Sequence, residues 1–499
     1  MLFATTPYIV RGLGPDVYGV WATTVAAVAF LGLFDLGGAA ASLKYGAESI
    51  ATGDYSSIKR IVGTTLILQT AIGVFLGAAL FMAAPGLPER LFKIPAGCVA
   101  DAEFVLRVTA FVLAAQFMRA SLASIPRAAQ RYGLVAAVDV IVSTGTTLAA
   151  VAVVRLGAGV RALAVAHAVM AWLAVLLHAT VVLRLVPEPL VGWRFDRRLF
   201  RVLLRFGIFS ALSALGSTAL VQLNRLYISS LLGATALTYY VVTHAVALKI
   251  HQVVAQAAHI VFPLSSSLLA RAEYQRIRRL YETGAKVTVA CAAGVAVPLI
   301  PLAAPILRLW LGPEFAERSA VIFKLQICAS LLLACTVVPH NLLNGIGRPH
   351  INTAFIAFET LVITVLGYLF TKSYGLIGAA VATLVAYLDV VAAIWYVEAK
   401  VLRCPVWSTS LRVYGVPILA ACIGTALGNL AAGAEGPLVA SIALRYLASA
   451  AAGFLLSWHM ALSKQEREIL IAAARTLRHW RQKTVATSFE SHESRAIGS

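Results

Sequence analysis

Charge is what this sequence has least of. Only 13% of its 499 residues are charged and 60% are hydrophobic, and a water-soluble chain of this length has no interior large enough to hide so much apolar side chain. Acidic residues are the scarcer sign, with 22 Asp and Glu against 41 Lys and Arg, which disfavours a carboxylate-lined cavity for cationic ligands. Because the basic residues are dispersed over many short loops, they do not indicate nucleic-acid binding.

Cysteine and the common catalytic motifs are also scarce. The six cysteines are scattered without CxxC or metal-ligand spacing, so neither a disulfide framework nor a zinc site is expected. The chain contains no GxxxxGK[ST], GxSxG or HExxH, and therefore gives no sign of nucleotide binding or hydrolytic chemistry. We expect no enzyme activity and no bound metal.

Long apolar runs, by contrast, are abundant. Stretches of about 20 residues, each long enough to cross roughly 30 Å of hydrocarbon as a helix, recur along the chain. Their cores lie at 17–41, 61–84, 104–125, 134–154, 160–183, 203–223, 235–262, 286–307, 319–343, 351–370, 376–397, 411–432 and 437–461. The ten residues before them, MLFATTPYIV, are expected to be the second half of one more span. The sequence therefore predicts an all-α polytopic membrane protein of about 14 transmembrane helices, the first one truncated.

The basic residues are biased to one side of these spans. With the loop after span 17–41 placed in the cytoplasm, 27 Lys and Arg lie inside and 9 lie outside, Arg225 among them, and the other five of the 41 fall within spans. Positive charge marks the cytoplasmic side, so both termini are predicted to be cytoplasmic. The bias also predicts contact with anionic membrane lipids.

An internal repeat is visible at an offset of 219 residues. Leu13-Gly14 aligns with Leu232-Gly233, and GDYSSIKRI (53–61) aligns with AEYQRIRRL (272–280) without a gap. The copies are separated by an even number of spans and therefore share an orientation. Two parallel six-helix lobes around a central cavity, a transporter arrangement, are the predicted architecture.

The spans and the repeat together divide the chain into five predicted segments. They are an N-terminal six-helix lobe (1–186), a basic cytoplasmic linker (187–202), a C-terminal six-helix lobe (203–400), two additional transmembrane helices (405–462) and a cytoplasmic amphipathic and disordered tail (463–499). The tail begins SKQEREILIAAARTLRHWRQK, where apolar residues recur at helical spacing among many Arg and Lys. That pattern is typical of a helix lying on anionic lipid.

Several short motifs resemble one family. LGPDVYGVWA, FDLGGAAASLKYGAES, NRLYISSLLGATALTYYVV, FPLSSSLLAR, LRLWLGPEF, NLLNGIGRP and YGLIGAAVATLV occur in family order over about residues 8–400. Together they resemble polysaccharide-type lipid flippases of the multidrug/oligosaccharidyl-lipid/polysaccharide (MOP) exporter superfamily. The resemblance implies a transporter of the bacterial inner membrane that flips undecaprenyl-diphosphate-linked oligosaccharide to the periplasmic leaflet for O-antigen, capsule or exopolysaccharide synthesis. It would work beside glycosyltransferases and a polysaccharide polymerase, without a cofactor, and the identity of a coupling ion stays open.

Two other functional classes remain open at this point. One is a multidrug or peptidoglycan-precursor exporter of the same superfamily. An exporter of cationic drugs is expected to have a cavity lined by acidic residues. The other is a membrane-embedded glycan polymerase or ligase, which is expected to have a sizeable outer loop that carries catalytic side chains. The longest predicted outer loop, about residues 85–103, is too short for that.

A diphosphate crossing hydrocarbon needs a hydrated cationic path, because isolated charges at the bilayer centre cost several kcal/mol. Span 235–262 offers one wall of such a path, since six polar side chains fall within one helical arc at about 100° per residue. They are His244, Lys249, His251, Gln252, Gln256 and His259. We predict that Lys249, His251, Gln252 and Gln256 bind substrate; the alternative is a polar face packed on a neighbouring helix.

Four further residues complete the predicted substrate site. Arg107 and Arg119 lie within span 104–125, and their alternative role is to reach the membrane interfaces. Asn224 stands nine residues before Gly233, where the family it resembles often carries an acid; because Asn cannot titrate, a proton-coupling role does not carry over. Arg225 follows it directly.

Asp35 is an acid inside the first complete apolar run. As a structural residue it would cap a helix that restarts after a kink. As a functional residue it would hold a lumen Arg or Lys until the diphosphate competes, or take up a cation. We assign it to coupling or gating.

Overall fold

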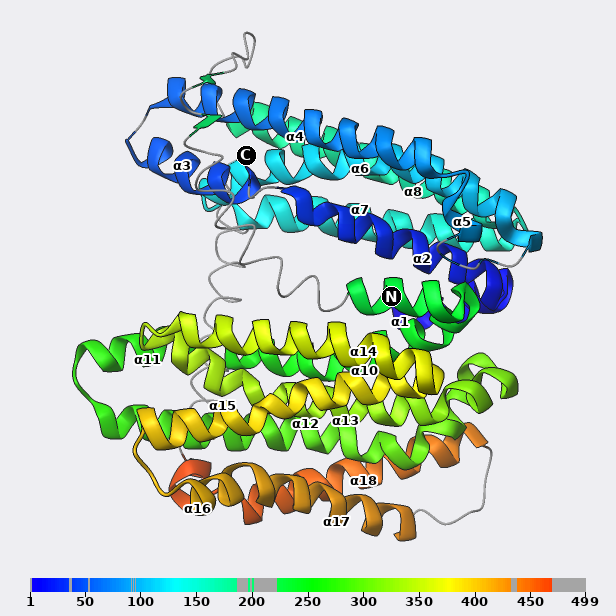
Figure 1. The fold of residues 1–499 in the computed structure, drawn as a ribbon. Helices are drawn as coiled ribbons and strands as arrows, with labels where there is room; N and C mark the ends of the chain where they lie inside the picture. The colour runs from blue at the N-terminus through cyan, green and yellow to red at the C-terminus, as the bar shows by residue number, and fades with distance from the viewer. Residues whose placement is uncertain are drawn as a thin grey trace, which may run out of the picture. The chain divides into compact units, whose positions relative to one another are not determined.

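The computed structural model describes residues 2–35, 38–52, 54–90, 92, 94, 96–185, 196–197, 200–201, 222–431 and 438–468, and these residues form helices and turns without any β-strand. The N-terminal helices (Figure 1) are α1 (Leu2–Leu13), α2 (Pro15–Leu31), η1 (Gly32–Asp35), α3 (Gly38–Thr52), α4 (Tyr55–Ala83), α5 (Leu87–Arg90), η2 (Ala96–Cys98), α6 (Val99–Ala128), α7 (Tyr132–Arg155) and α8 (Gly159–Leu185). Most of the predicted linker and of the predicted tail lie outside the described residues.

The C-terminal part of the chain continues the all-helical pattern. After a helical stretch at 222–232 come α10 (Ala234–Ala258), α11 (Val261–Ala270), α12 (Tyr274–Leu311), α13 (Pro313–Gly345), α14 (Pro349–Ala386), η3 (Tyr387–Asp389), α15 (Val390–Tyr396), η4 (Val397–Val401), α16 (Val406–Ser410), η5 (Leu411–Gly415), α17 (Val416–Ala431) and α18 (Leu438–Met460). Helix α14 is interrupted at Gly375, whose φ of 61° lies in the left-handed region, at the turn predicted between spans 351–370 and 376–397.

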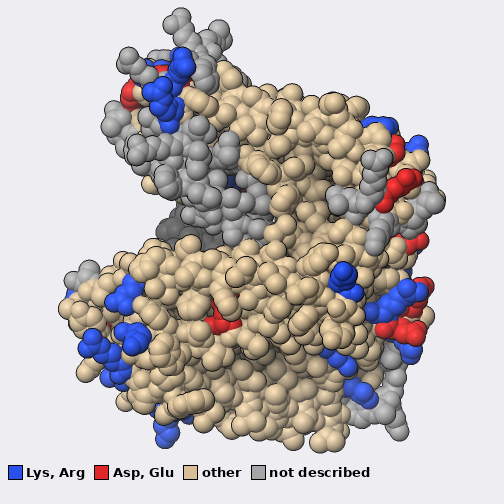
Figure 2. All heavy atoms as spheres, viewed as in Figure 1, with Lys and Arg blue, Asp and Glu red and all other residues tan. Residues whose placement is uncertain are grey.

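Nine helices in the described part of the chain are long and apolar enough to cross a membrane. They are Ser56–Ala83, Val99–Ala128, Tyr132–Arg155, Gly159–Leu185, Tyr274–Leu311, Pro313–Gly345, Pro349–Val401, Val406–Ala431 and Val439–Met460. The 53-residue run Pro349–Val401 covers two of the predicted spans, and Pro15–Leu31 is a shorter apolar helix. In Figure 2 most of the visible described surface is neither acidic nor basic. The predicted all-α polytopic membrane fold is confirmed.

Helix starts follow the predicted repeat. Gly14 and Gly233, 219 residues apart, both have positive φ, 81° and 90°, and each directly precedes a helix, α2 and α10. Tyr55 and Tyr274, at the same offset, are the first residues of α4 and α12. Glycine is required at the first pair because a side chain strains a backbone with positive φ. The two halves of the chain therefore use the same local signals to begin equivalent helices.

Three sequence expectations need correction. Predicted spans 17–41 and 235–262 are each broken: η1 ends α2 before α3 begins, and α10 ends at Ala258 before α11 begins. Arg225, predicted in an outer loop, lies instead in the helix that continues to residue 232. The charge of Arg225 ended the apolar window in the sequence, but the following Leu, Tyr, Ile and Ser residues extend the helix to Gly233.

By internal packing the chain forms two compact units. The first comprises Met1–Leu248, Ala304–Ala329 and His350–Asp389, and the second comprises Lys249–Ala303, Ser330–Pro349 and Val390–Ser499. In the first unit α6 packs against α3, α4 and α8 around buried aliphatic side chains such as Ile58, Leu66 and Leu122.

In the second unit α17 packs closely on α18. Gly424 and Gly428, spaced as GxxxG, lie against the backbone of Gly453 and Ser449, where a Cβ atom would collide. Small residues at this spacing let two membrane helices approach to backbone contact. The GxxxG pair is a packing signal that the sequence analysis did not use.

Candidate functional site

A stripe of exposed polar side chains runs along α10. Lys249, Gln252 and Gln256 are all exposed and recur every three or four residues on one helical face, and His259, which is also exposed, lies in the turn that follows. The Lys249 Nζ donates a hydrogen bond to Gln252 Oε1 at 2.7 Å. We call Lys249, Gln252 and Gln256 the α10 polar stripe. At 25 residues α10 is long enough to span, yet it is absent from the nine apolar helices above.

The rest of the predicted arc on α10 is less open. His251 is half-buried, and it interacts electrostatically with His340 of α13. His244, one and a half turns before Lys249, is buried and stacks on Tyr240 with ring centroids 5.7 Å apart. The structure therefore splits the arc: His244 packs into its surroundings, whereas Lys249 and the two glutamines do not.

Asn224 lies in a buried hydrogen-bonded network of the first unit. Its Nδ2 donates to the Tyr240 hydroxyl and to Thr383 Oγ1, each at 3.1 Å. Gln326 Nε2 donates to the Tyr240 carbonyl, also at 3.1 Å. Residues from four segments thus form one buried polar cluster, and the Asn224 amide group is hydrogen-bonded within it.

Arg225 lies beside this network. It is half-buried, and its charge acts on the hydroxyls of Tyr18 and Tyr240 and on the imidazole of His244. Tyr18, Tyr240 and Thr383 each lie in one of the motifs that resemble the family, but no motif singled them out as site residues, because hydroxyl residues in apolar helices are common. The structure brings Asn224 together with Tyr240 and Thr383, and Arg225 together with Tyr18 and Tyr240.

The two predicted arginines of α6 are both paired. Arg107 contacts Glu103 one turn earlier at 3.3 Å, and Arg119 contacts Asp139 of α7 at 3.0 Å. Arg119 also lines a cavity of about 520 Å³ in the first unit, together with the polar side chains Gln116, Thr146 and His167. Arg119 thus reaches a cavity large enough for a polar ligand.

The predicted gating residue Asp35 is the last residue of η1, at the break between α2 and α3. The Asp35 side chain lies outside what the structure describes, so its coupling or gating role, by holding a lumen Arg or Lys or by taking up a cation, stays a prediction. Two other acids, Glu359 of α14 and Asp389 of η3, are buried with their carboxyl groups facing each other. In the described residues no cluster of three or more His, Cys, Asp or Glu is arranged to hold a metal ion.

A second polar cluster, missed by the sequence analysis, is buried in the second unit. Ser410 donates to Glu398 at 2.6 Å and Tyr281 donates to it at 3.2 Å, while the hydroxyls of Tyr281 and Tyr414 lie 3.0 Å apart. We call these four residues the Glu398 network. Tyr281 and Glu398 are 117 residues apart in sequence, and no local pattern predicts their contact.

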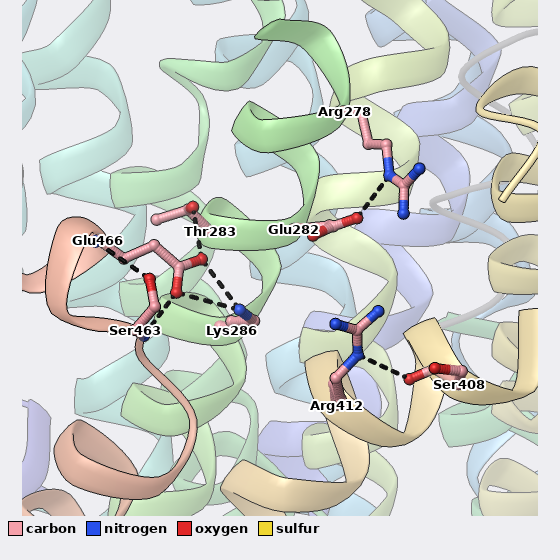
Figure 3. Close-up of polar contacts among 8 residues, drawn as sticks. All are labelled: Arg278, Glu282, Thr283, Lys286, Ser408, Arg412, Ser463 and Glu466. Atoms are coloured by element: carbon pink, nitrogen blue, oxygen red, sulfur yellow. Dashed lines mark hydrogen bonds and ion pairs between the residues drawn. The ribbon is translucent and has the colours of Figure 1, made fainter. Parts of the chain in front are cut away.

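The start of the tail is anchored on α12 (Figure 3). Ser463 and Glu466 form a capping box, and Glu466 also accepts hydrogen bonds from Thr283 and from the Lys286 ammonium, both at 2.9 Å. Burial alone would raise the pKa of the Glu466 carboxyl, but these hydrogen bonds together hold its pKa below the usual value. The SKQE sequence was the signal that could have predicted this cap. At the other end of the chain, Asp54 caps α4, and hydrogen bonds from Ser57 and Ser56 lower its pKa to about 2.

Known proteins resemble this chain in sequence and in fold. A protein described as an O-antigen transporter of Shigella flexneri is 23% identical over 387 residues, covering 75% of this chain and 88% of that protein. The uncharacterized membrane protein EpsK of Bacillus subtilis is 20% identical, covering 64% of this chain and 63% of that protein.

Among solved structures, the lipid II flippase MurJ in an inward closed conformation matches with a TM-score of 0.69 at 15% identity, covering 91% of this chain and 97% of that one. An inward-facing multidrug resistance transporter of the MATE family matches with a TM-score of 0.67 at 16% identity, covering 78% of this chain and 92% of that one. Both show that the fold is that of the MOP superfamily. The model of the polysaccharide biosynthesis protein family matches residues 9–320, and the chain belongs to that family.

Proposed function

We propose that this protein is a transporter that flips an undecaprenyl-diphosphate-linked oligosaccharide from the cytoplasmic to the periplasmic leaflet by alternating access of its two lobes. Family membership, the similarity to an O-antigen transporter and the MOP fold support transport of a lipid-linked glycan. The product would enter O-antigen, capsule or exopolysaccharide synthesis, in company with glycosyltransferases and a polymerase.

The observation that carries this proposal is the exposure of Lys249 in the α10 polar stripe. An ammonium exposed on a membrane helix is costly unless it faces a water-filled path, and a cation on such a path favours an anionic ligand. The glutamines beside it offer hydrogen bonds of the kind that sugar hydroxyls use. Helix α10 contains no Asp or Glu, so this surface does not suit the cationic substrates of a drug exporter.

We propose further that the protein resides in the bacterial inner membrane with both termini in the cytoplasm. Single cysteines introduced at Gln275 and Glu317, in a background without native cysteines, test this orientation. Both positions are exposed; Gln275 lies at the start of α12, and Glu317 lies near the start of α13, after the chain has run the length of α12. An impermeant thiol reagent added to intact cells should label the Glu317 site and spare the Gln275 site. The reverse labelling would overturn the orientation.

Deletion of the chromosomal gene tests the function in cells. The proposal expects lipid-linked oligosaccharide to accumulate on the cytoplasmic face, where an impermeant sugar-oxidising reagent reaches it only in inverted vesicles. If the protein were a glycan polymerase or ligase, single repeat units would accumulate on the periplasmic face instead. Normal surface polysaccharide in the deletion strain would contradict the proposal.

A further inference from the structure

A basic pocket separate from the α10 polar stripe lies within the second unit. Its volume is about 600 Å³, within the range of small-molecule sites. The lining comes from the end of α11, the start of α12, the turn between α13 and α14, and the end of η4. Four of its residues are cationic, namely Arg278, Arg348, Lys400 and Arg403, and none of its lining residues is acidic.

Three of these cations keep charge available for a ligand. Arg278 is paired with Glu282 at 2.7 Å, visible in Figure 3. Arg348 donates a hydrogen bond to the uncharged Tyr396 hydroxyl at 3.4 Å, and the Lys400 ammonium lies 5.8 Å from the Trp395 ring centroid. Arg403 is exposed. Among the described residues none of these three cations is in an ion pair, so the pocket presents about three positive charges to a ligand.

The segment that carries Arg403 is held in place by its own backbone. Arg403 has a positive φ of 49°, rare for a residue with a side chain. The flanking amides fix this conformation: Leu402 N–H donates to the Val397 carbonyl at 2.8 Å, and Cys404 N–H donates to the Glu398 carbonyl at 2.9 Å. The backbone that carries Arg403 in the pocket wall is consequently held in a defined conformation by hydrogen bonds.

Aromatic residues around the pocket indicate its depth in the membrane. Tyr274 lines the pocket and Trp395 lies beside Lys400, and they are 66% and 48% exposed. Exposed Trp and Tyr side chains are typical of the level of the lipid headgroups. A cationic pocket at that level meets phosphate groups of lipids before it meets solutes of the bulk solvent.

We propose that this pocket binds the phosphodiester headgroup of an anionic glycerophospholipid. Free phosphate shares the chemistry that Arg and Lys recognise, and the aromatic rim favours the lipid as its source. The site differs from the diffuse attraction of the other basic loops, because four segments converge on one cavity. The inference goes beyond transport, since the lipid would bind whether or not glycan is flipped.

Binding of dioleoylphosphatidylglycerol to the purified full-length protein, titrated by native mass spectrometry in detergent, tests the site. Each charge near a lipid surface is worth about fivefold in affinity, so Lys400→Gln should weaken binding about fivefold. The triple variant Arg348→Gln/Lys400→Gln/Arg403→Gln should weaken it about 100-fold. Arg348→Lys with Arg403→Lys should retain binding within about fivefold, and dioleoylphosphatidylcholine should bind weakly to all forms.

The matched control removes three exposed charges elsewhere, by Arg155→Gln, Arg308→Gln and Lys372→Gln, and should leave phosphatidylglycerol affinity unchanged. Equal affinity of the wild type and of the pocket triple variant would overturn the proposal. Displacement of phosphatidylglycerol by millimolar inorganic phosphate would overturn the lipid assignment in favour of a soluble phosphate. Because no transport is measured, failure here is independent of failure of the proposed function.

Discussion

The α10 polar stripe and the Glu398 network place polar groups in the same unit with opposite consequences. In the Glu398 network the carboxyl group is fully buried and accepts hydrogen bonds from Ser410 and Tyr281. In the stripe, Lys249 is exposed and its ammonium bonds to one neighbouring amide. Buried polar groups that satisfy one another stabilise a fold, whereas an exposed charge on a membrane helix adds little stability and remains available to a ligand. The difference separates residues expected to control folding from residues expected to control transport.

The largest expected effect is that of Lys249→Ala on transport. A hydrogen bond to a charged group contributes roughly 1.5–3 kcal/mol, so the variant should lose at least about tenfold of the wild-type polysaccharide export. Lys249→Arg should retain part of it, because the charge survives while its geometry changes. Thermal stability in detergent should stay at the wild-type value. Lys372→Ala, an exposed lysine elsewhere, serves as the matched control.

The double variant Asp35→Ala/Lys249→Ala distinguishes two roles of this lysine. If Lys249 binds the diphosphate, the double variant should be as inactive as Lys249→Ala. If Lys249 only neutralises Asp35, removing both charges should restore export, because the penalty comes from an unpaired ion. Full export in the double variant would refute the substrate-binding role.

The Glu398 network should show the opposite pattern. Glu398→Ala removes the acceptor of two buried hydroxyl donors and should lower the free energy of unfolding by about 1–3 kcal/mol. Glu398→Gln keeps one acceptor oxygen and should cost less. Thermal unfolding in detergent measures both variants. If Glu398→Ala unfolded like the wild type but lost transport, the proposed division between stabilising and ligand-binding groups would be wrong.

The smallest expected effect is that of the tail anchor at Glu466. A carboxyl pKa that is lower in the folded protein stabilises it above the unfolded value, about 4.3, and this stabilisation is lost as the pH falls through the lower folded pKa. Glu466→Gln removes the ion pair with Lys286 and should reduce stability at pH 7 by about 1 kcal/mol. The difference from the wild type should shrink below about pH 4. Glu468→Gln, an exposed acid in the same turn, should change nothing. A Glu466→Gln difference that grew on acidification would contradict the anchor.

The sequence predicted the fold where local signals decide it. Apolar runs give the helices, and Gly14, Gly233, Tyr55 and Tyr274 mark helix starts at one offset. The break after α2 lies at Asp35, where a helix restarting after a kink was one of the two alternatives drawn from the sequence. The break after α10 was missed, because apolar residues resume directly after His259. Arg225 was placed in a loop because its charge ended an apolar window of the sequence. Its surroundings could not be predicted, because its neighbours Tyr18 and Tyr240 come from distant segments.

For the candidate site, the sequence identified which polar residues share a helical face better than it predicted what surrounds each of them. Helical spacing on α10 identified Lys249, Gln252 and Gln256 as one face, because that geometry is local. It did not separate them from His244, whose burial depends on Tyr240 and the helices packed around it. The pairing of Arg119 with Asp139 and the Glu398 network were beyond prediction for the same reason, since each joins side chains from different helices.

Leaflet exchange in proteoliposomes tests the central claim most directly. Purified protein is reconstituted with a fluorescent undecaprenyl-diphosphate-linked oligosaccharide, and an impermeant quencher reports the fraction in the outer leaflet over time. The account predicts exchange that is fast with the wild type, reduced at least about tenfold with Lys249→Ala and unaffected by Lys372→Ala. Exchange no faster than in protein-free liposomes, or equally fast with Lys249→Ala, would contradict it.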